Sequence, residues 1–381
     1  MTKPNLLVLG ASGGVARAFL LLLAEKRHLL NALILLDKKE DCLSSPVLDH
    51  KKLDYIFIKK EILFSSDDSS YHDILSKYQV SAVLDLTDLD TLPILESTNR
   101  AGVAYLNTAM NGVGVTTDKL ITSITERRGE IAGASHILCA GMNPGNVNIW
   151  VQNGIRKFGD PEKIIHFEFD TSMTSGEWRP LVTWSRAKFL AEAVYDPGGV
   201  ALGRGRFKKI LPNAIENLVD MEPMLSPILK LESYPSGLPI LHEENITIAN
   251  RHDLPSEFIY SIHLKTMEFL QKTYREKGTI VPDDLILADN ASMPLEGQDL
   301  IGVVLSYPDK DVYYYNALEN KSVRGTNATY HQVAVGVMAA LLTWLDGLEA
   351  GVYFTGELYD TIYTKYLFNN LKIEEKIFTK S

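Results

Sequence analysis

The fold is decided by the stretch Leu6-Leu7-Val8-Leu9-Gly10-Ala11-Ser12-Gly13-Gly14-Val15-Ala16. Uninterrupted apolar residues are typical of a buried parallel strand, and a glycine-rich turn that leads into a helix presents backbone N–H groups to a pyrophosphate. The stretch therefore predicts an α/β fold with a Rossmann-type, doubly wound parallel sheet. The residues expected to bind the dinucleotide in this turn are Gly10, Ser12, Gly13, Gly14 and Val15.

A second apolar run, Leu33–Leu36, ends in Asp37. A carboxylate at this position accepts a hydrogen bond from a ribose 2′-OH, which favours NAD as the cofactor. Lys38 and Lys39 follow directly and would suit a 2′-phosphate. The sequence thus predicts NAD and leaves NADP open.

Further strands are expected at 55–58, 81–88, 103–107 and 136–139. Ligands bind at the carboxyl edge of such a sheet, so Asp85, Thr87 and Asn143 are predicted to line the cofactor site. Asn143 stands in a glycine- and proline-rich turn, and a turn asparagine without a function is the alternative.

The composition bounds the possible functions. The chain has 381 residues, enough for two domains, and a net charge of −10 with no basic stripe, which argues against nucleic acid as a partner. Its two cysteines, Cys42 and Cys139, are expected to be buried thiols, so no disulfide framework is predicted and a cytoplasmic location is expected. Neither a metal-ligand spacing nor a membrane span is predicted.

Three regions are expected along the chain. Residues 1–146 form the NAD-binding domain, and residues 147–326 form an α+β domain for substrate binding and dimerisation, with strands at 164–170, 237–241 and 245–249. Residues 327–381 form a helical segment, including the apolar stretch Ala334–Leu345, that returns to pack on the first domain.

The segment around Trp184 is predicted to bind a cation. Ser185 is a suitable N-cap for a helix over 186–194, which places Trp184 just before the helix and Glu192 about two turns along it. A tryptophan face attracts an ammonium group, and a glutamate supplies the counter-charge. A tryptophan packed in the core is the alternative.

A second pair of candidate residues is His242 and Glu244. If they enter the strand expected at 245–249, period-two alternation places both on one face, where they could hold and deprotonate an amine. A solvated charged turn is the alternative.

Four separated motifs give the chain a resemblance to the bacterial homospermidine synthases, relatives of the saccharopine and carboxynorspermidine dehydrogenases. The motifs are Gly141-Met-Asn143-Pro-Gly145, Thr183-Trp-Ser185 with Glu192 beyond it, His242-x-Glu244, and Asn327-Ala-Thr329. The resemblance implies an NAD-dependent transfer of an aminobutyl group between diamines such as putrescine, through an imine and with return of the hydride. It also implies that Asn143 holds the reacting nitrogen, that Trp184, Glu192 and Glu244 bind amines, and that His242 orients the amine or relays a proton. A homodimer is the expected assembly.

Two departures from the family pattern keep other functions open. The family's acidic Glu-Pro-Trp stretch is replaced by Ala109–Gly112, and its Gly-Trp-Gly segment is replaced by one that contains Arg204 and Arg206. Two arginines would suit a carboxylate, as in a reductase that joins an amine to a carbonyl compound with NAD(P)H. A nucleotide-sensing protein without turnover is the third possibility.

Overall fold

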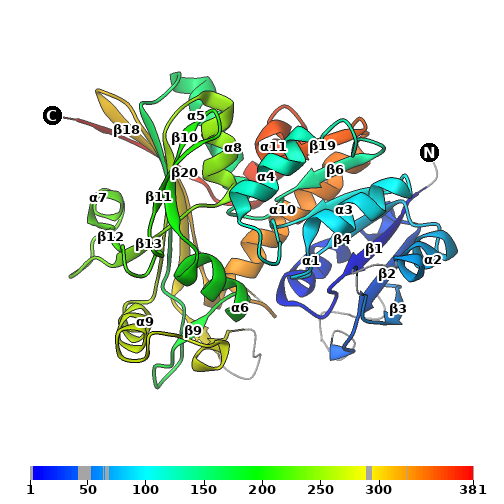
Figure 1. Ribbon diagram of the computed structural model, residues 1–381, viewed down its shortest axis with the longest axis horizontal. Helices are drawn as coiled ribbons and strands as arrows, with labels where there is room; N and C mark the ends of the chain where they lie inside the picture. Colours follow the sequence, from blue (N-terminus) through cyan, green and yellow to red (C-terminus); the bar gives the residue numbers. More distant parts are fainter. Residues whose placement is uncertain are drawn as a thin grey trace. The chain divides into compact units, whose positions relative to one another are not determined.

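The computed structural model describes residues 3–41, 53–62, 64, 68–288, 294–323 and 325–380. These residues divide into two compact units. Unit 1 comprises Met1–Asn146 and Tyr330–Asn370, and unit 2 comprises Val147–Thr329 and Leu371–Ser381 (Figure 1). Each unit is therefore built from two separate stretches of the chain.

Unit 1 contains a parallel sheet of seven strands in the order β3-β2-β1-β4-β5-β6-β19. Its strands are β1 (Asn5–Leu9), β2 (Ala32–Asp37), β3 (Ile56–Lys59), β4 (Ala82–Asp85), β5 (Ala104–Asn107), β6 (Ser135–Leu138) and β19 (Gly351–Phe354). The chain moves outward in one direction from β1 to β3 and in the other from β4 to β6. This reversal next to β1 is the doubly wound Rossmann order, so the predicted fold class is confirmed.

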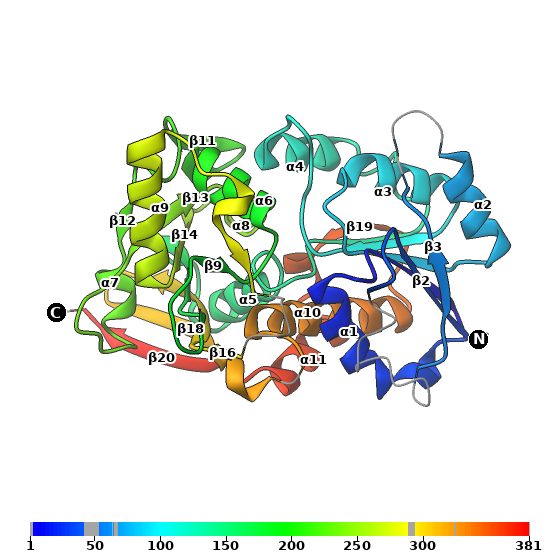
Figure 2. The same cartoon turned by 90° about the horizontal axis from the view of Figure 1, so that it is seen from below.

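Helices cover both faces of this sheet, as Figure 2 shows. On one face lie α2 (Ser69–Lys77), α3 (Thr91–Arg100) and α4 (Thr117–Glu126), and on the other lie α1 (Gly14–Ala24), α10 (Ala328–Leu345) and α11 (Ile362–Asn370). Helix α10 is the one helix of the described residues that is long and apolar enough to cross a membrane, but 72% of it is buried inside the structure. Its apolar composition is thus accounted for by its burial in the protein.

Unit 2 contains a mixed sheet of nine strands. Its strands are β7 (Lys163–Asp170), β10 (Gly198–Gly203), β11 (Arg206–Ile210), β12 (Val219–Asp220), β13 (Ser236–Ile240), β14 (Ser256–Ile262), β17 (Gln298–Ser306), β18 (Lys310–Glu319) and β20 (Glu374–Thr379). Strand β7 lies inside the sheet, parallel to β14 and antiparallel to β17. Two small ladders complete the strands, β9 (Leu181–Val182) with β15 (Ile286–Leu287) and β8 (Met173–Thr174) with β16 (Leu295–Glu296).

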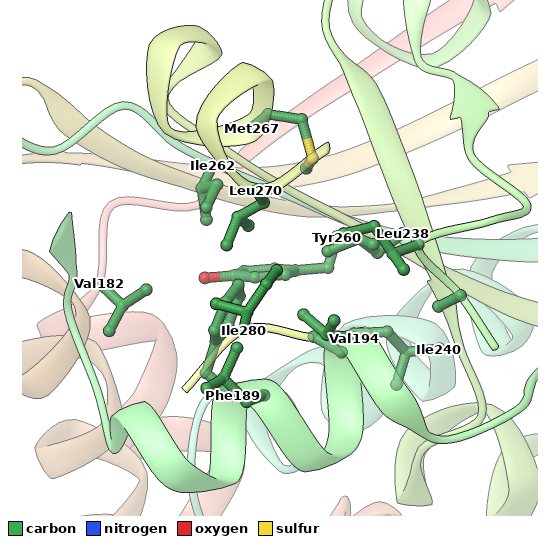
Figure 3. Close-up of a cluster of buried hydrophobic side chains, with 14 of the residues drawn as sticks. Val182, Phe189, Val194, Leu238, Ile240, Tyr260, Ile262, Met267, Leu270 and Ile280 are labelled. Atoms are coloured by element: carbon green, nitrogen blue, oxygen red, sulfur yellow. The ribbon is translucent and has the colours of Figure 1, made fainter. Parts of the chain in front are cut away.

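The helices of unit 2 are mostly short. They are α5 (Asn146–Phe158), α6 (Arg186–Phe189) with the π-helix Leu190–Tyr195 directly after it, α7 (Glu222–Leu225), α8 (Glu243–His252) and α9 (Leu264–Lys277). On one face of the sheet, Tyr260 lies at the centre of an apolar cluster that includes Phe189 and Leu270 (Figure 3). The preceding residue of β14, Ile259, belongs to a separate cluster, because side chains alternate between the two faces of a strand.

The strand predicted at 245–249 is wrong, because these residues lie in helix α8. The Asn245 side chain accepts a hydrogen bond from the His242 backbone N–H at 2.9 Å and donates one to the Ile240 carbonyl at 3.1 Å. These bonds cap the start of a helix, and such capping overrides the preference of the β-branched residues at 246–248 for a strand.

The C-terminal region also differs from the expected helical segment over 327–381. Residues Gly351–Phe354 form the seventh strand of the first sheet, parallel to β6. Residues Glu374–Thr379 form β20, which pairs with β18 in the sheet of unit 2. The hydroxyls of Tyr314 and Tyr315 donate hydrogen bonds to Glu375 and Glu374 at 2.8 and 2.7 Å, so tertiary partners hold this end of the chain as a strand.

Candidate functional site

The glycine turn of unit 1 leaves no room for a side chain at its first position. Gly10 has a φ of +75°, and a Cβ there would lie 2.7 Å from the Leu86 carbonyl oxygen. The Gly10 N–H donates to the Leu36 carbonyl at 3.1 Å. The turn therefore lies against the ends of β2 and β4, where an ordinary residue would be both strained and too large.

Gly14 begins helix α1 and packs against Tyr330. A Cβ at position 14 would overlap the Tyr330 ring, closer than any real van der Waals contact. The N-cap is Gly13, and in the described structure no side chain caps this helix and no acidic residue lies in its first turn. The start of α1, which includes Val15, therefore presents backbone N–H groups as an anion site requires.

Asp37 is held beside the same turn. Its Oδ2 accepts a hydrogen bond from the Ser12 N–H at 2.9 Å, and its Oδ1 accepts one from the Lys39 N–H at 3.0 Å. Lys38 forms an ion pair with Glu61 at 3.1 Å. The structure thus brings together Ser12 and Asp37, which the sequence analysis assigned to one cofactor site.

Asp85 and Thr87 lie at the end of β4 and bond mainly to each other. Asp85 Oδ1 accepts from the Thr87 N–H and Oγ1 at 3.0 and 2.7 Å, and its Oδ2 accepts from the Tyr105 hydroxyl at 2.7 Å. Burial raises the pKa of Asp85. Both carboxylate oxygens thus accept hydrogen bonds from the protein. Asp85 therefore fixes the shape of the loop in which the Leu86 carbonyl lies against Gly10.

Asn143 lies half-buried in a closed turn that follows β6. The Gly141 N–H donates to the Pro144 carbonyl at 3.0 Å, and the Asn146 N–H donates to the Gly141 carbonyl at 3.1 Å. Gly336 of α10 packs so closely on the Gly141 carbonyl that a Cβ there would overlap it. The turn predicted from the glycines and the proline is therefore held rigidly.

In unit 2, His242 lies between two glutamates. Its Nδ1 is 2.6 Å from Glu244 Oε2, and its Nε2 is 3.7 Å from Glu192 Oε2. The three side chains are 13%, 0% and 18% exposed, in the order His242, Glu244, Glu192. The predicted pair of His242 and Glu244 is present, although it forms at the start of a helix and not along a strand.

The charges of this cluster support one another. Burial opposes the charged form of His242, but the charge of Glu244, its hydrogen bond and the charge of Glu192 raise the pKa of His242 to about 9. Burial acts to raise the pKa of Glu244, and the neighbouring imidazolium outweighs it and lowers that pKa. Near neutral pH the pair is therefore an imidazolium and a carboxylate.

A third acid, Glu243, is 1% exposed beside this pair. Burial raises the pKa of Glu243 to about 8, against the effect of a hydrogen bond from Thr247 Oγ1 at 2.7 Å. Asn148 Nδ2 also donates to this carboxyl, at 3.2 Å. No role for Glu243 is predicted from the sequence, since adjacent glutamates in a sequence do not show which is buried.

Trp184 is half-buried against aromatic residues. Its Nε1 donates to the Tyr260 hydroxyl at 3.1 Å, and its ring meets the Phe189 ring edge-to-face, with 5.9 Å between centroids. Ser185 is the N-cap of α6, as predicted, and its Oγ accepts from the Lys188 N–H at 3.4 Å. Glu192 lies in the following π-helix, whose wider turn changes the direction in which a side chain points.

A buried acid network that the sequence analysis missed joins two of the family-like motifs. Thr183 Oγ1 donates to Asp170 Oδ2 at 2.6 Å, and Thr329 Oγ1 donates to Asp299 Oδ2 at 2.7 Å. Asn327 Nδ2 donates to the Thr183 carbonyl at 3.0 Å. The two acids are paired in register on β7 and β17, and burial raises the pKa of both. In the sequence, the polar end of the strand predicted at 164–170 was the feature that could have indicated this network.

Arg204 lies in the turn between β10 and β11, Arg206 is the first residue of β11, and both contact the same acid. Each forms an ion pair with Asp253, that of Arg206 at 3.8 Å, and their side chains are 76% and 65% exposed. Cys139 is buried, as predicted, and Cys42 lies outside the described residues. In the described part of the chain, no group of three or more His, Cys, Asp or Glu side chains is placed to hold a metal ion.

The whole chain is similar in fold to a solved structure. The chain is similar to the homospermidine synthase of Legionella pneumophila, solved in complex with NAD, with 14% identity, a TM-score of 0.77 and coverage of 100% of this chain and 92% of that one. At this level of identity the likeness shows a shared fold.

More distant similarities were found to two dehydrogenases. One is the WlbA dehydrogenase of Thermus thermophilus, with 10% identity, a TM-score of 0.40 and coverage of 96% and 94% of the two chains. The other is a myo-inositol dehydrogenase of Corynebacterium glutamicum, with 8% identity, a TM-score of 0.42 and the same coverage. No family model and no curated protein sequence matches the chain.

Proposed function

We propose that this protein is an NAD-dependent enzyme of the homospermidine synthase type, which transfers an aminobutyl group between diamines such as putrescine. The observation that carries the proposal is the buried cluster of His242 between Glu192 and Glu244. It occurs in a chain whose whole length shares the fold of a homospermidine synthase.

The glycine turn of unit 1 fits a dinucleotide. The tight turn that Gly10 permits and the uncapped start of α1 suit a pyrophosphate, and the Asp37 carboxylate suits a ribose 2′-OH. When bound there, NAD supplies the chemistry of accepting and returning a hydride. In this proposal Asn143 holds the reacting nitrogen next to the cofactor, and Asp85 and Thr87 shape the loop that contacts it.

The residues of unit 2 suit a cationic amine. Two carboxylates around one imidazolium leave an excess of negative charge, and the indole of Trp184 attracts a cation through its π face. Glu244 fixes the Nδ1 proton of His242, so Nε2, which faces Glu192, is the atom that exchanges a proton with the amine. A neutral amine is needed for hydride loss, and an ammonium is needed as the leaving group.

The test is to incubate the purified protein with putrescine and substoichiometric NAD⁺ and to measure homospermidine by mass spectrometry and ammonia separately. The proposal expects homospermidine in excess over the cofactor together with an equal amount of ammonia. NAD binding without either product would overturn it.

The alternative is a reductase that joins an amine to a carbonyl compound. It is favoured by the presence of Arg204 and Arg206, although both are paired with Asp253, which caps the end of α8 opposite to His242. Consumption of NADH or NADPH in proportion to product would support this reductase and exclude the synthase.

A further inference from the structure

His166 is a buried imidazole whose hydrogen bonds are unaccounted for. It lies on β7 and is 1% exposed, and neither Nδ1 nor Nε2 has a hydrogen-bond partner among the described residues. Buried polar groups in folded proteins are almost always paired with protein or with an ordered small molecule. The His166 ring therefore needs a hydrogen-bond partner other than these residues.

The neighbouring strands offer none at this position. His166 pairs in register with Phe258 of β14 and Val303 of β17, whose side chains lie on the same face of the sheet. Both are apolar. A partner for His166 must therefore come from the elements that cover this face.

Helix α8 covers the sheet at this point and contacts both β7 and β14. The His242 ring lies 5.9 Å from the Phe258 ring, measured between centroids, which brings the first turn of α8 next to His166. The charge of Glu244 acts on His166, and the charge of His166 acts on Glu244. Glu244 and His242 are the titratable groups that the structure shows acting on His166.

Glu244 also has an unused oxygen. Its Oε2 lies 2.6 Å from His242 Nδ1, whereas its Oε1 is buried and has no hydrogen-bond partner in the described structure. His166 and Glu244 are thus neighbours that are not hydrogen-bonded to each other directly, and each has at least one buried polar atom without a hydrogen-bond partner among the described residues.

We propose that Glu244 Oε1 and His166 enclose a binding site for one small hydrogen-bonding molecule of the size of water or ammonia, which bridges the two side chains. The molecule donates to the carboxylate oxygen and forms its second hydrogen bond with a ring nitrogen of His166. The carboxylate excludes an anion from this position.

The state of His166 agrees with this role. Burial lowers the pKa of His166 to about 4, so the ring is neutral at physiological pH and has one donor and one acceptor nitrogen. The bound molecule would then hold the Glu244 carboxylate in place, and this carboxylate orients His242. The importance of that orientation for catalysis rests on the proposed function, whereas the site itself does not.

A high-resolution crystal structure tests the site. The wild-type protein is expected to show a density peak within about 3.2 Å of both Glu244 Oε1 and a ring nitrogen of His166. In His166→Phe, which keeps a ring of similar size, the peak is expected to vanish while the contact of His242 with Glu244 remains. In Glu244→Gln the peak is expected to persist, because an acceptor oxygen is retained.

The occupant is identified by NMR with ¹⁵N-labelled ammonium. A slowly exchanging ¹H–¹⁵N signal that disappears in His166→Phe assigns ammonium, and a density peak without such a signal assigns water. Either result supports the site. A direct hydrogen bond of His166 to protein, or a wild-type map without the peak, would overturn it. The peak does not depend on turnover of an amine, so this test and that of the proposed function can fail separately.

Discussion

The glycine turn of unit 1 and the His242 cluster of unit 2 are built in opposite ways. The turn depends on the missing Cβ atoms of Gly10 and Gly14, because the Leu86 carbonyl and the Tyr330 ring occupy that space. The cluster works through buried charge, with Glu244 fully buried against a protonated His242. A backbone site is therefore sensitive to added volume, whereas a charge site is sensitive to the loss of a single proton or charge.

The largest effect is expected in the charge site. Glu192→Gln and Glu244→Gln each keep the side-chain volume and remove one carboxylate from His242, so kcat for the diamine reaction is expected to fall by about 10²- to 10⁴-fold. NAD affinity, measured by calorimetry, is expected to be unchanged. The exposed Glu268→Gln on α9 serves as the control. Wild-type rates in both cluster variants would remove these glutamates from the site.

The backbone site is tested by adding one methyl group. Gly14→Ala places a Cβ into the Tyr330 ring and is expected to destabilise the protein by about 1–3 kcal/mol and to weaken NAD binding. Gly129→Ala, where a Cβ meets nothing within 4 Å, is the matched control and should change little.

The same contact can be relieved from the other side. In a Tyr330→Leu background, the loss caused by Gly14→Ala should be smaller, as measured by denaturant unfolding of all four combinations. Equal losses in both backgrounds would show that Tyr330 is not the reason for the glycine.

The cofactor preference depends on one side chain next to the turn. Asp37→Ala removes a charged acceptor for a ribose hydroxyl, so NAD affinity is expected to fall by about 1.5–3 kcal/mol, with a smaller loss for NADP. Binding of both dinucleotides is measured by calorimetry, with the exposed Glu40→Gln as the control. Equal losses for NAD and NADP would contradict a specific contact with the 2′-OH.

The pH dependence of stability is expected to depend on Glu243, the third acid of the cluster, which Thr247 and Asn148 hydrogen-bond. The pKa of Glu243 rises from a usual 4.5 to about 8 in the folded protein, so the folded state holds this proton more tightly than the unfolded state does. Stability due to this group is complete below about pH 4.5 and is lost as the pH rises toward 8.

Glu243→Gln removes this dependence. Its stability relative to wild type is therefore expected to improve from pH 5 to pH 8, measured by urea unfolding at both values. Glu268→Gln should show no such trend. A constant difference for Glu243→Gln would mean that Glu243 is ionised in the folded protein.

Much of unit 1 could be predicted because its signals are local. The apolar runs that end in Leu9, Asp37 and Asp85 each form a parallel strand. Such strands are buried on both faces, so a continuous apolar run is enough to predict them without knowledge of the neighbouring strands. Ser185 was recognised as an N-cap for the same reason, because a cap involves residues three positions apart.

Unit 2 was harder to predict because its decisive contacts join distant residues. The run Ile246-Thr247-Ile248 suggested a strand, but the bonds of Asn245 to His242 and Ile240 start a helix there. The acid network of Asp170 and Asp299 joins residues more than a hundred positions apart, and the polar end of the strand predicted at 164–170 does not show that Asp299 lies opposite it.

The sequence by itself determined the parallel sheet, the glycine turn and the residue types available for amine chemistry. The tertiary structure alone decided which of them are buried and what they contact. Glu244 contacts His242, Glu243 accepts a hydrogen bond from Asn148, and His166 lies between Phe258 and Val303. The physical reason is that the sequence alone fixes the chemical type of each side chain. Its pKa and its unmet hydrogen bonds depend on the segments that fold against it.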